Sequence, residues 1–171
     1  MKIQVGGLSE GVHSYSFRST PADVGLPPEF KSDVEVQAAL EKSSGQLLLR
    51  ASVSTSAEVT CDRCLKLIQQ PLQSKYQMYY LWEEPEEDRY DPSEVQVLTP
   101  GQNVLDLTDD VRQTVVLSLP LKHVCREDCK GICPMCGKNL NDGPCTCTET
   151  REDGRWDKLK ELQNNNLNQA G

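Results

Sequence analysis

The chain has 171 residues, of which 37% are hydrophobic and 5% aromatic, and its formal net charge is −8. This length suits one domain, or one domain with a small satellite, built around a thin core. The first 119 residues hold 18 Asp and Glu against 10 Lys and Arg, whereas the two kinds balance in the remainder. Broad electrostatic binding to nucleic acid is therefore excluded, and any RNA contact should be local and lie in the C-terminal third.

The sequence shows neither a secretion signal nor a membrane segment. The first thirty residues include charged side chains, Gly and Pro without an apolar stretch, and no later run is long enough to span a bilayer. We therefore expect a cytoplasmic protein with no membrane partner. In a reducing compartment, its eight cysteines are expected to bind metal or stay free rather than form disulfides.

The first half of the chain has the pattern of an antiparallel sheet. Apolar residues alternate over residues 34–40 and 76–82, which is the period of half-buried strands. Further strands are expected at residues 2–5, 12–17, 46–53 and 57–60, with turns at 6–7 and 43–45 and a loop at 21–28. Cys61 and Cys64 fall between two such strands, so we predict that they lie in a connection between antiparallel neighbours.

An acidic segment follows these strands. Residues 83–94 hold seven acids, one base and two prolines, which favours a solvated, flexible loop. A docking role is a second possibility for this loop, although its pattern does not require one. Another short strand is expected at residues 95–98.

One main helix is predicted from about residue 106 to 118. Apolar residues recur there every four positions, and either Asp106 or Thr108 can cap its beginning. Pro120 ends it, because proline cannot continue a helix. The β-branched pair Val115 and Val116 leaves a strand over residues 114–119 as the alternative.

The rest of the chain is expected to form a separate small module. We assign residues 1–120 to the β-rich domain and residues 121–162 to a Cys-rich zinc-binding module. Apolar residues at a spacing of three from Trp156 to Leu162 predict a short helix at its end. Residues 163–171 are expected to be a disordered tail.

Six of the eight cysteines lie within residues 125–147. Residues 133–137 (CPMCG) have the form of a zinc knuckle, in which two thiolates three positions apart share one ion. Gly137 permits the left-handed backbone that ends such a turn. Cys145 and Cys147 lie two positions apart, so in extended chain they face the same side and can complete the site. The first predicted site therefore consists of Cys133, Cys136, Cys145 and Cys147.

The remaining cysteines leave two groupings open. In the first grouping, a second site ties the predicted sheet to the module through Cys61, Cys64, Cys125 and Cys129. In the rival grouping, one site consists of Cys125, Cys129, Cys133 and Cys136, and the other of Cys61, Cys64, Cys145 and Cys147. The spacings do not decide between them, so we expect one or two Zn²⁺ ions.

No catalytic arrangement stands out in the sequence. A CxxC pair can act as a redox dithiol, but that chemistry usually needs the first Cys at a helix N-terminus. Cys61 and Cys64 lie between predicted strands instead. The sequence has no Ser-His-Asp arrangement, phosphate-binding Gly-rich loop or HExxH motif. We predict a protein that is not an enzyme and has no small-molecule substrate.

Five segments occur in a characteristic order. They are CDRCL at 61–65, LDLTDDVRQTVVLSLPLKHVC at 105–125, EDCKGICPMCGKNLN at 127–141, CTC at 145–147 and DGRWDKLKEL at 153–162. Together they resemble the YceD family, the large ribosomal RNA subunit accumulation proteins of bacteria and plastids, in its zinc-cysteine type. The resemblance implies a cytosolic, non-enzymatic factor needed for the synthesis, processing or stability of 23S rRNA.

The residues and the resemblance together predict a ribosome-biogenesis factor. Its expected fold is α+β, with an antiparallel curved or barrel-like sheet, one main helix and a C-terminal Cys-rich zinc-binding module. The expected partner is a 23S rRNA precursor or a basic ribosomal or processing protein. Residues available for contact with RNA are Arg126, Lys130, Lys138 and Arg155. The alternatives are a zinc-ribbon adaptor between proteins outside ribosome assembly and, less favoured, a CxxC dithiol oxidoreductase.

Overall fold

The computed structural model describes residues 1–85 and 89–147. The chain divides into two compact units, residues 1–129 and residues 130–171. The helix expected to end at Leu162 and the tail expected after it lie outside the described residues. None of the helices in the described ranges is long and apolar enough to cross a membrane.

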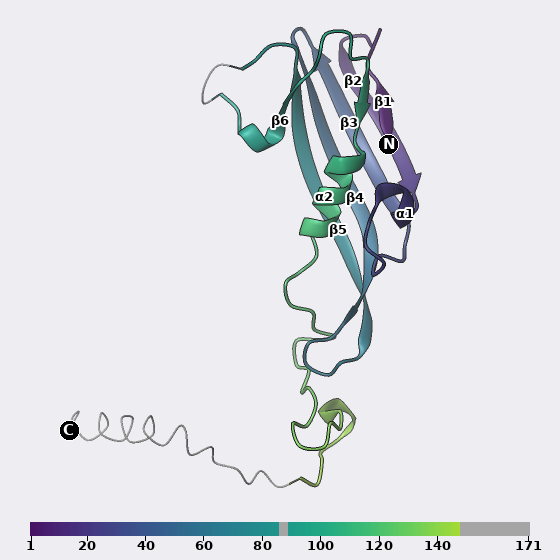
Figure 1. The fold of residues 1–171 in the computed structure, drawn as a ribbon, viewed down its shortest axis with the longest axis vertical. Helices are drawn as coiled ribbons and strands as arrows, with labels where there is room; N and C mark the ends of the chain where they lie inside the picture. The colour runs from purple at the N-terminus through teal and green to yellow at the C-terminus, as the bar shows by residue number, and fades with distance from the viewer. Residues whose placement is uncertain (86–88, 148–171) are drawn as a thin grey trace, which may run out of the picture. The chain divides into compact units, whose positions relative to one another are not determined.

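The first unit is built on a five-stranded sheet. Its strands, in spatial order, are β2 (Gly11–Ser19), β3 (Val34–Ser43), β4 (Gln46–Thr60), β5 (Leu67–Leu81) and β6 (Val95–Val97). Neighbours pair antiparallel except β5 and β6, which run parallel. The predicted α+β class is confirmed, but the sheet is open, with β2 and β6 at its edges, and does not close into a barrel (Figure 1).

Strands β4 and β5 form a long hairpin of 15 residues each. The two strand segments expected at residues 46–53 and 57–60 are one continuous strand, and its pairing with β5 runs from Gln46 opposite Leu81 to Thr60 opposite Leu67. The connection between them contains Cys61 and Cys64, as the sequence predicts.

A second, two-stranded sheet joins distant parts of the chain. Strand β1 (Lys2–Gln4) pairs antiparallel with β7 (Val104–Asp106). The strand expected at residues 2–5 therefore belongs to a different sheet from the strand that follows it. Its partner β7 was not predicted, because three residues are too few to show an alternating pattern.

The loop expected at residues 21–28 contains a single helical turn, α1 (Pro21–Val24). Thr20 and Asp23 form a capping box across its first turn, and Gly25 ends it in the left-handed conformation. The Thr-Pro-x-Asp pattern was therefore a helix-start signal within a segment whose Gly and Pro residues favoured a loop.

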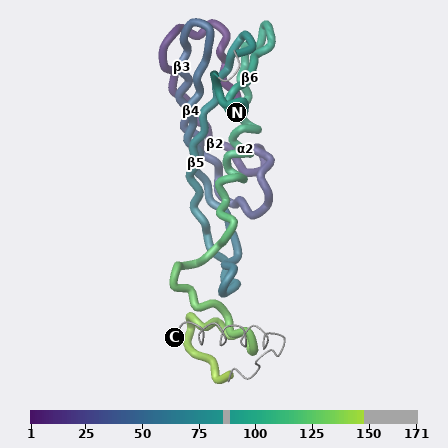
Figure 2. The backbone as a smooth tube through the Cα atoms, turned by 90° about the vertical axis from the view of Figure 1, so that its left-hand side faces the viewer, coloured from purple at the N-terminus to yellow at the C-terminus, as the bar shows by residue number. Residues whose placement is uncertain are grey.

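The main helix is α2 (Thr108–Leu117). Its N-cap is Leu107, which forms no side-chain cap, so neither Asp106 nor Thr108 is the cap residue that the sequence suggested. Asp106 lies one residue earlier, and its carboxylate accepts a hydrogen bond from the Thr108 backbone N–H at 3.1 Å. Val111 and Val115 are buried on the face that packs against the sheet. Figure 2 shows α2 on one side of the strands. The helical backbone continues to Leu117, which excludes the alternative strand over residues 114–119.

The core lies between α2 and one face of the sheet. Period-two alternation places every second residue of β3 and β4 in this core, and the fully buried members include Val34, Val36, Leu40, Leu47 and Leu49. The intervening residues, among them Arg50 and Ser52, lie on the opposite face, where the 3-10 helix η1 (Pro92–Glu94) contacts β5 through a hydrogen bond from Gln77 to Glu94. The sheet is therefore apolar on one side and largely polar on the other.

The described part of the second unit has little regular structure. It contains an isolated bridge between Ile132 and Asn139 and the 3-10 helix η2 (Leu140–Asp142). Asn139 caps η2 by accepting the backbone N–H of Asn141 at 3.0 Å. The Asn-rich loop between its cysteines thus forms an ordered turn.

Candidate metal centres

The end of the β4–β5 hairpin forms a tight turn around Cys61 and Cys64. The Cys61 N–H donates to the Lys66 carbonyl at 2.8 Å, and the Leu65 N–H donates back to the Cys61 carbonyl at 2.9 Å. Leu65 has a φ of 60°, a left-handed conformation that is unusual for a leucine. This turn, residues 61–66, is the first knuckle, and it directs both sulfurs to one side.

The segment after α2 brings two further cysteines to the first knuckle. Asp62 and His123 bind each other twice, through the Asp62 N–H to the His123 carbonyl at 2.8 Å and through the His123 N–H to the Asp62 carboxylate at 2.7 Å. The Arg63 guanidinium donates to the carbonyls of Glu127 at 2.9 Å and Cys129 at 3.0 Å. These contacts hold residues 123–129 beside the hairpin end.

The resulting arrangement, the first cysteine group, consists of Cys61, Cys64, Cys125 and Cys129. The sulfurs of Cys61 and Cys129 lie 4.0 Å apart, and those of Cys64 and Cys125 lie 3.7 Å apart. A tetrahedron of thiolates around a metal at about 2.3 Å has edges of about 3.8 Å. All four sulfurs lie within 4.8 Å of one another, so the group could hold a metal ion.

A second knuckle, residues 133–138, repeats the first in the second unit. The Cys133 N–H donates to the Lys138 carbonyl at 2.8 Å, and the Gly137 N–H donates to the Cys133 carbonyl at 2.9 Å. Gly137 has a φ of 72° and stands where the first knuckle has Leu65. The two CxxC segments thus share one backbone hydrogen-bonding pattern, although their surroundings differ.

The second cysteine group consists of Cys133, Cys136, Cys145 and Cys147. Lys138 donates from its ammonium group to the Pro144 carbonyl at 2.8 Å, which holds the CTC segment beside the second knuckle. The four sulfurs again lie within 4.8 Å of one another. Because all eight cysteines are free of disulfides, each group offers four thiol ligands.

Backbone N–H groups stabilise one thiolate in each group. Hydrogen bonding from the backbone of Cys64 lowers the pKa of Cys61 to about 6. In the same way, the backbone N–H groups of Cys136 and Met135 lower the pKa of Cys133 to about 6. The first cysteine of each knuckle is therefore ready to bind a cation near neutral pH.

Crowding has the opposite effect on the cysteines that face the knuckles. The neighbouring sulfur of Cys129 raises the pKa of Cys125 to about 12, and that of Cys136 raises the pKa of Cys147 to about 12. Four sulfurs at these distances do not all ionise unless a cation balances their charge. A bound divalent metal supplies that charge and deprotonates its thiol ligands.

The structure thus brings together the same sets of four as the first grouping derived from the sequence. The rival sets do not form a cluster among the described residues. Sequence reasoning missed Asp62 and Arg63, which position the first group. No local pattern could have identified them, because their partners lie about sixty residues further along the chain.

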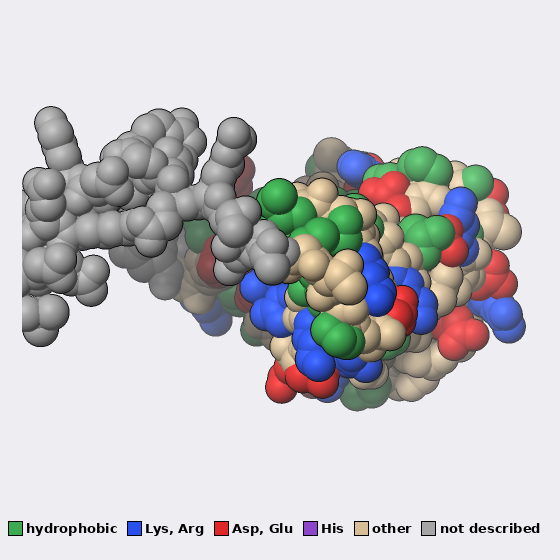
Figure 3. Space-filling view, turned by 90° about the horizontal axis from the view of Figure 1, so that it is seen from below, with side chains coloured by type: hydrophobic (Ala, Val, Ile, Leu, Met, Phe, Trp, Pro, Cys, Tyr) green, Lys and Arg blue, Asp and Glu red, His purple; other side chains and the backbone are tan. Residues whose placement is uncertain are grey.

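The basic residues proposed for RNA contact are exposed where the structure describes them, but two of them already form contacts within the protein. Arg126 pairs with Asp128 at 3.2 Å, and Lys138 binds a carbonyl within its own unit. Lys130 is exposed, and Arg155 lies outside the described residues. Basic, acidic and hydrophobic side chains are interspersed on the face seen in Figure 3.

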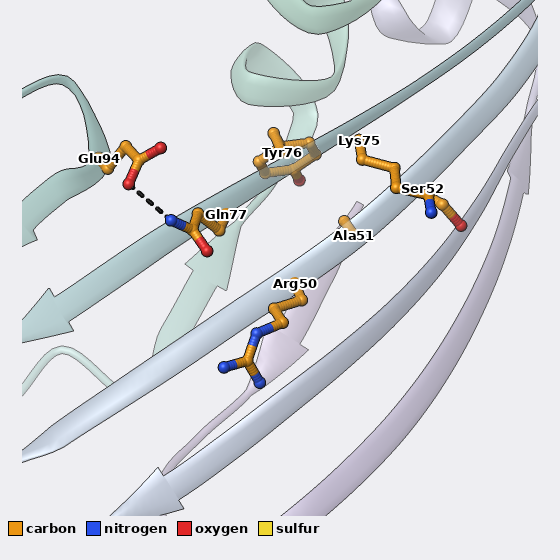
Figure 4. Close-up of a pocket in the computed structure, with 7 residues that line it drawn as sticks. All are labelled: Arg50, Ala51, Ser52, Lys75, Tyr76, Gln77 and Glu94. Atoms are coloured by element: carbon orange, nitrogen blue, oxygen red, sulfur yellow. Dashed lines mark hydrogen bonds between the residues drawn. The ribbon is translucent and has the colours of Figure 1, made fainter.

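A shallow cavity of about 530 Å³ lies on β4 and β5. Glu94 accepts a hydrogen bond from the Gln77 amide at 2.7 Å on one wall, and Arg50 lies on β4 opposite (Figure 4). Arg50 is paired with Glu41 at 3.3 Å. The residues that line this cavity include no nucleophile beside a general base, so it offers no acid-base catalytic arrangement.

Taken together, the fold and the two groups define an α+β protein with two candidate metal centres. A sequence model of the family described as large ribosomal RNA subunit accumulation protein YceD matches residues 49–163. This match covers more than half of the chain and includes every cysteine of both groups. The chain therefore belongs to the YceD family.

Individual relatives have low sequence identity to this chain. An uncharacterized protein of Mycobacterium tuberculosis is 29% identical over 158 residues, which cover 91% of this chain and 72% of the relative. The chloroplastic YCED homolog 1 of Zea mays is 24% identical over 85% of this chain and 60% of its own length. Its Arabidopsis thaliana counterpart is 31% identical over 37% of this chain and 20% of its own. No solved structure matches the chain.

Proposed function

We propose that this protein is a non-enzymatic ribosome-biogenesis factor that supports the accumulation of 23S rRNA in the cytoplasm. The observation that carries the proposal is the family match over residues 49–163, because the family is named for the accumulation of large-subunit ribosomal RNA. The matched region contains β5, α2 and both cysteine groups, so the family match includes the main structural elements described above.

The two cysteine groups are proposed to hold one Zn²⁺ each. Four thiolates in a near-tetrahedral arrangement are the ligand set of a structural zinc site, whereas a catalytic site keeps a position open for water. The S–S distances of 3.7 Å and 4.0 Å in the first group support this assignment. Zinc would supply positive charge and rigidity here, and the chain's residues would supply the binding surface.

The charge distribution supports a basic ribosomal or processing protein as the direct partner. The chain has a net charge of −8, and all of its excess acid lies in the first 119 residues. Such a surface attracts basic proteins and repels phosphate. Binding of the 23S rRNA precursor itself through Lys130 is the alternative within the same function.

Depletion of the protein tests its role in ribosome assembly. We expect the ratio of 23S to 16S rRNA to fall, and re-expression of the wild-type chain to restore it. An unchanged ratio would contradict the proposal and favour an adaptor outside ribosome assembly. Affinity capture before and after ribonuclease treatment identifies the partner class. A ribosomal protein that stays bound after treatment supports the basic partner, whereas loss of all bound material supports RNA.

A dithiol oxidoreductase is not supported by the geometry of Cys61. Its sulfur lies among three other sulfurs, in a connection between strands rather than at a helix N-terminus. Native mass spectrometry of protein purified without added metal tests the zinc assignment. Two zinc ions per chain are expected, and a metal-free protein with all its thiols reduced would refute it.

A further inference from the structure

The two cysteine groups differ in their exposure to solvent. In the first group, Cys61, Cys64 and Cys129 retain 0%, 6% and 4% of their accessible surface. In the second group Cys133 is buried, but Cys136 and Cys147 are exposed. A small solute in water therefore reaches the sulfurs of the second group more readily.

The surroundings of the two groups also differ, and they hold the first group in place more firmly than the second. The hydrophobic core cluster comes from residues 3–115, and its main strands β4 and β5 lead directly into the first knuckle. Asp62 and Arg63 fasten that knuckle to residues 123–129 without any metal. Among residues 130–147, by contrast, Ile132 and Leu140 are only half-buried. We therefore expect that segment to depend on its metal for a fixed conformation.

The second group also borders a small hollow, which three of its four cysteines line. The hollow has a volume of about 200 Å³ and is lined by Cys133, Pro134, Met135, Leu140, Cys145 and Cys147. This lining is mostly apolar and, among residues 1–85 and 89–147, includes no charged side chain. A neutral oxidant such as a hydroperoxide can enter this space, whereas a charged one is less suited to it.

We infer that Cys136 and Cys147 form an oxidation site for hydroperoxides, and that oxidation there releases the metal of the second group while the first group keeps its own. The inference rests on the metal centres of the proposed function. It assigns the first group to the permanent fold and the second to a segment whose folded state depends on redox conditions.

The reaction balances with one hydroperoxide for each disulfide. The thiolates of Cys136 and Cys147 lose two electrons and form an S–S bond, while the O–O bond of the peroxide breaks. Two protons from solvent complete two waters from hydrogen peroxide, or one water and one alcohol from an alkyl hydroperoxide. A metal held by this group would then keep only Cys133 and Cys145 as ligands and would dissociate, so residues 130–147 would lose the link that it provides.

The test uses the full-length protein loaded with zinc. Hydrogen peroxide is added in limiting amounts, zinc release is followed with a chromogenic chelator, and the oxidised cysteines are mapped by differential alkylation and mass spectrometry. We expect one zinc to leave at least about tenfold faster than the other, together with a disulfide between Cys136 and Cys147. Equal release rates, or prior oxidation of Cys61 and Cys64, would overturn the inference.

Two double variants make the comparison specific. Cys136→Ser with Cys147→Ser should hold one zinc that resists peroxide, whereas Cys61→Ser with Cys64→Ser should hold one zinc that peroxide releases as fast as in the wild type. If the second variant does not fold, the oxidised cysteines mapped in the wild-type chain still show which group reacts first. Wild-type protein that binds no zinc would refute the proposed metal centres themselves. Loss of both zinc ions at the same rate would refute only the proposed difference in sensitivity to peroxide between the two groups.

Discussion

Leu65 and Gly137 occupy equivalent positions in the two knuckles but place different demands on the backbone. Both are left-handed, with φ values of 60° and 72°. Glycine adopts this conformation freely, whereas a side chain makes it costly by roughly 1–2 kcal/mol. The Leu65 side chain is 60% exposed, so burial does little to offset that cost.

Exchanging these residues should affect different quantities, because Asp62 and Arg63 hold the first knuckle in place without a metal. Leu65→Gly is expected to raise the free energy of unfolding by up to about 1 kcal/mol, because relief of the backbone strain exceeds the roughly 0.4–1 kcal/mol of extra chain entropy. Gly137→Ala is expected to weaken zinc binding by the second group about two- to fivefold. A Cβ at Gly137 would meet no atom within 4 Å, so only the backbone conformation is tested. Urea titration measures the first effect and chelator competition the second, and a loss of stability in Leu65→Gly would show that its side chain is needed.

Asp110 should make stability depend on pH. Burial, and then the charge of Asp109, raise its pKa in the folded protein. The folded state therefore holds the proton more tightly than the unfolded chain, so this carboxyl destabilises the fold above its folded pKa and ceases to do so at acidic pH. Asp110→Asn is expected to raise the midpoint of urea unfolding at pH 7, with a smaller gain near pH 4.

The neighbouring carboxyl provides the control for that variant. Asp109 is 80% exposed and pairs with Arg112 at 3.3 Å. Because its charge is the second cause of the raised pKa of Asp110, Asp109→Asn should lessen the pH dependence without abolishing it, since the burial of Asp110 remains. A lower unfolding midpoint for Asp110→Asn at pH 7 would instead mean that attraction to the positive end of α2 outweighs the cost of burial.

At the scale of elements, the predictable parts were those with a repeating local pattern. Alternation over residues 34–40 identified β3, and four-residue spacing together with Asp106 identified α2. The short strands expected at residues 2–5 and 95–98 are present as β1 and β6, but their pairings could not be predicted. Strand β1 pairs with β7, about a hundred residues later, and the parallel pairing of β6 has no local signal. The knuckle was predictable from CxxC spacing, whereas the partner cysteines of Cys61 required the fold.

The packing of α2 on the sheet can be tested on the helix itself. Val111 is fully buried, so Val111→Ala should lower the free energy of unfolding by about 1–3 kcal/mol through lost burial and a residual cavity. Val116 is 42% exposed on the same helix, and Val116→Ala should change it by less than about 0.5 kcal/mol. Denaturant titration at constant zinc measures both. Similar losses in the two variants would contradict this assignment of a buried and an exposed face, because alanine has the higher helix propensity and cannot itself cause a loss.

At the scale of the whole molecule, the two cysteine groups contribute differently to the fold. The first unit has a hydrophobic core and uses its cysteines to close the far end of the β4–β5 hairpin. In the second unit, the described residues gather around the cysteines themselves. The same CxxC turn therefore reinforces a stable sheet in one place and organises a small segment in the other.

Single cysteine substitutions should separate these two roles. Cys133→Ser is expected to remove one zinc and to abolish amide-exchange protection in residues 130–147, while β4 and β5 stay protected, because their core does not include that segment. Cys61→Ser is expected to remove the other zinc and to expose the end of the hairpin near Thr60 and Leu67, with protection retained around Leu49. Native mass spectrometry counts the metal, and hydrogen exchange locates the change. Loss of both zincs, or of protection throughout the sheet, in Cys133→Ser would show that the two units fold as one, since only then could a ligand of the second group control the first.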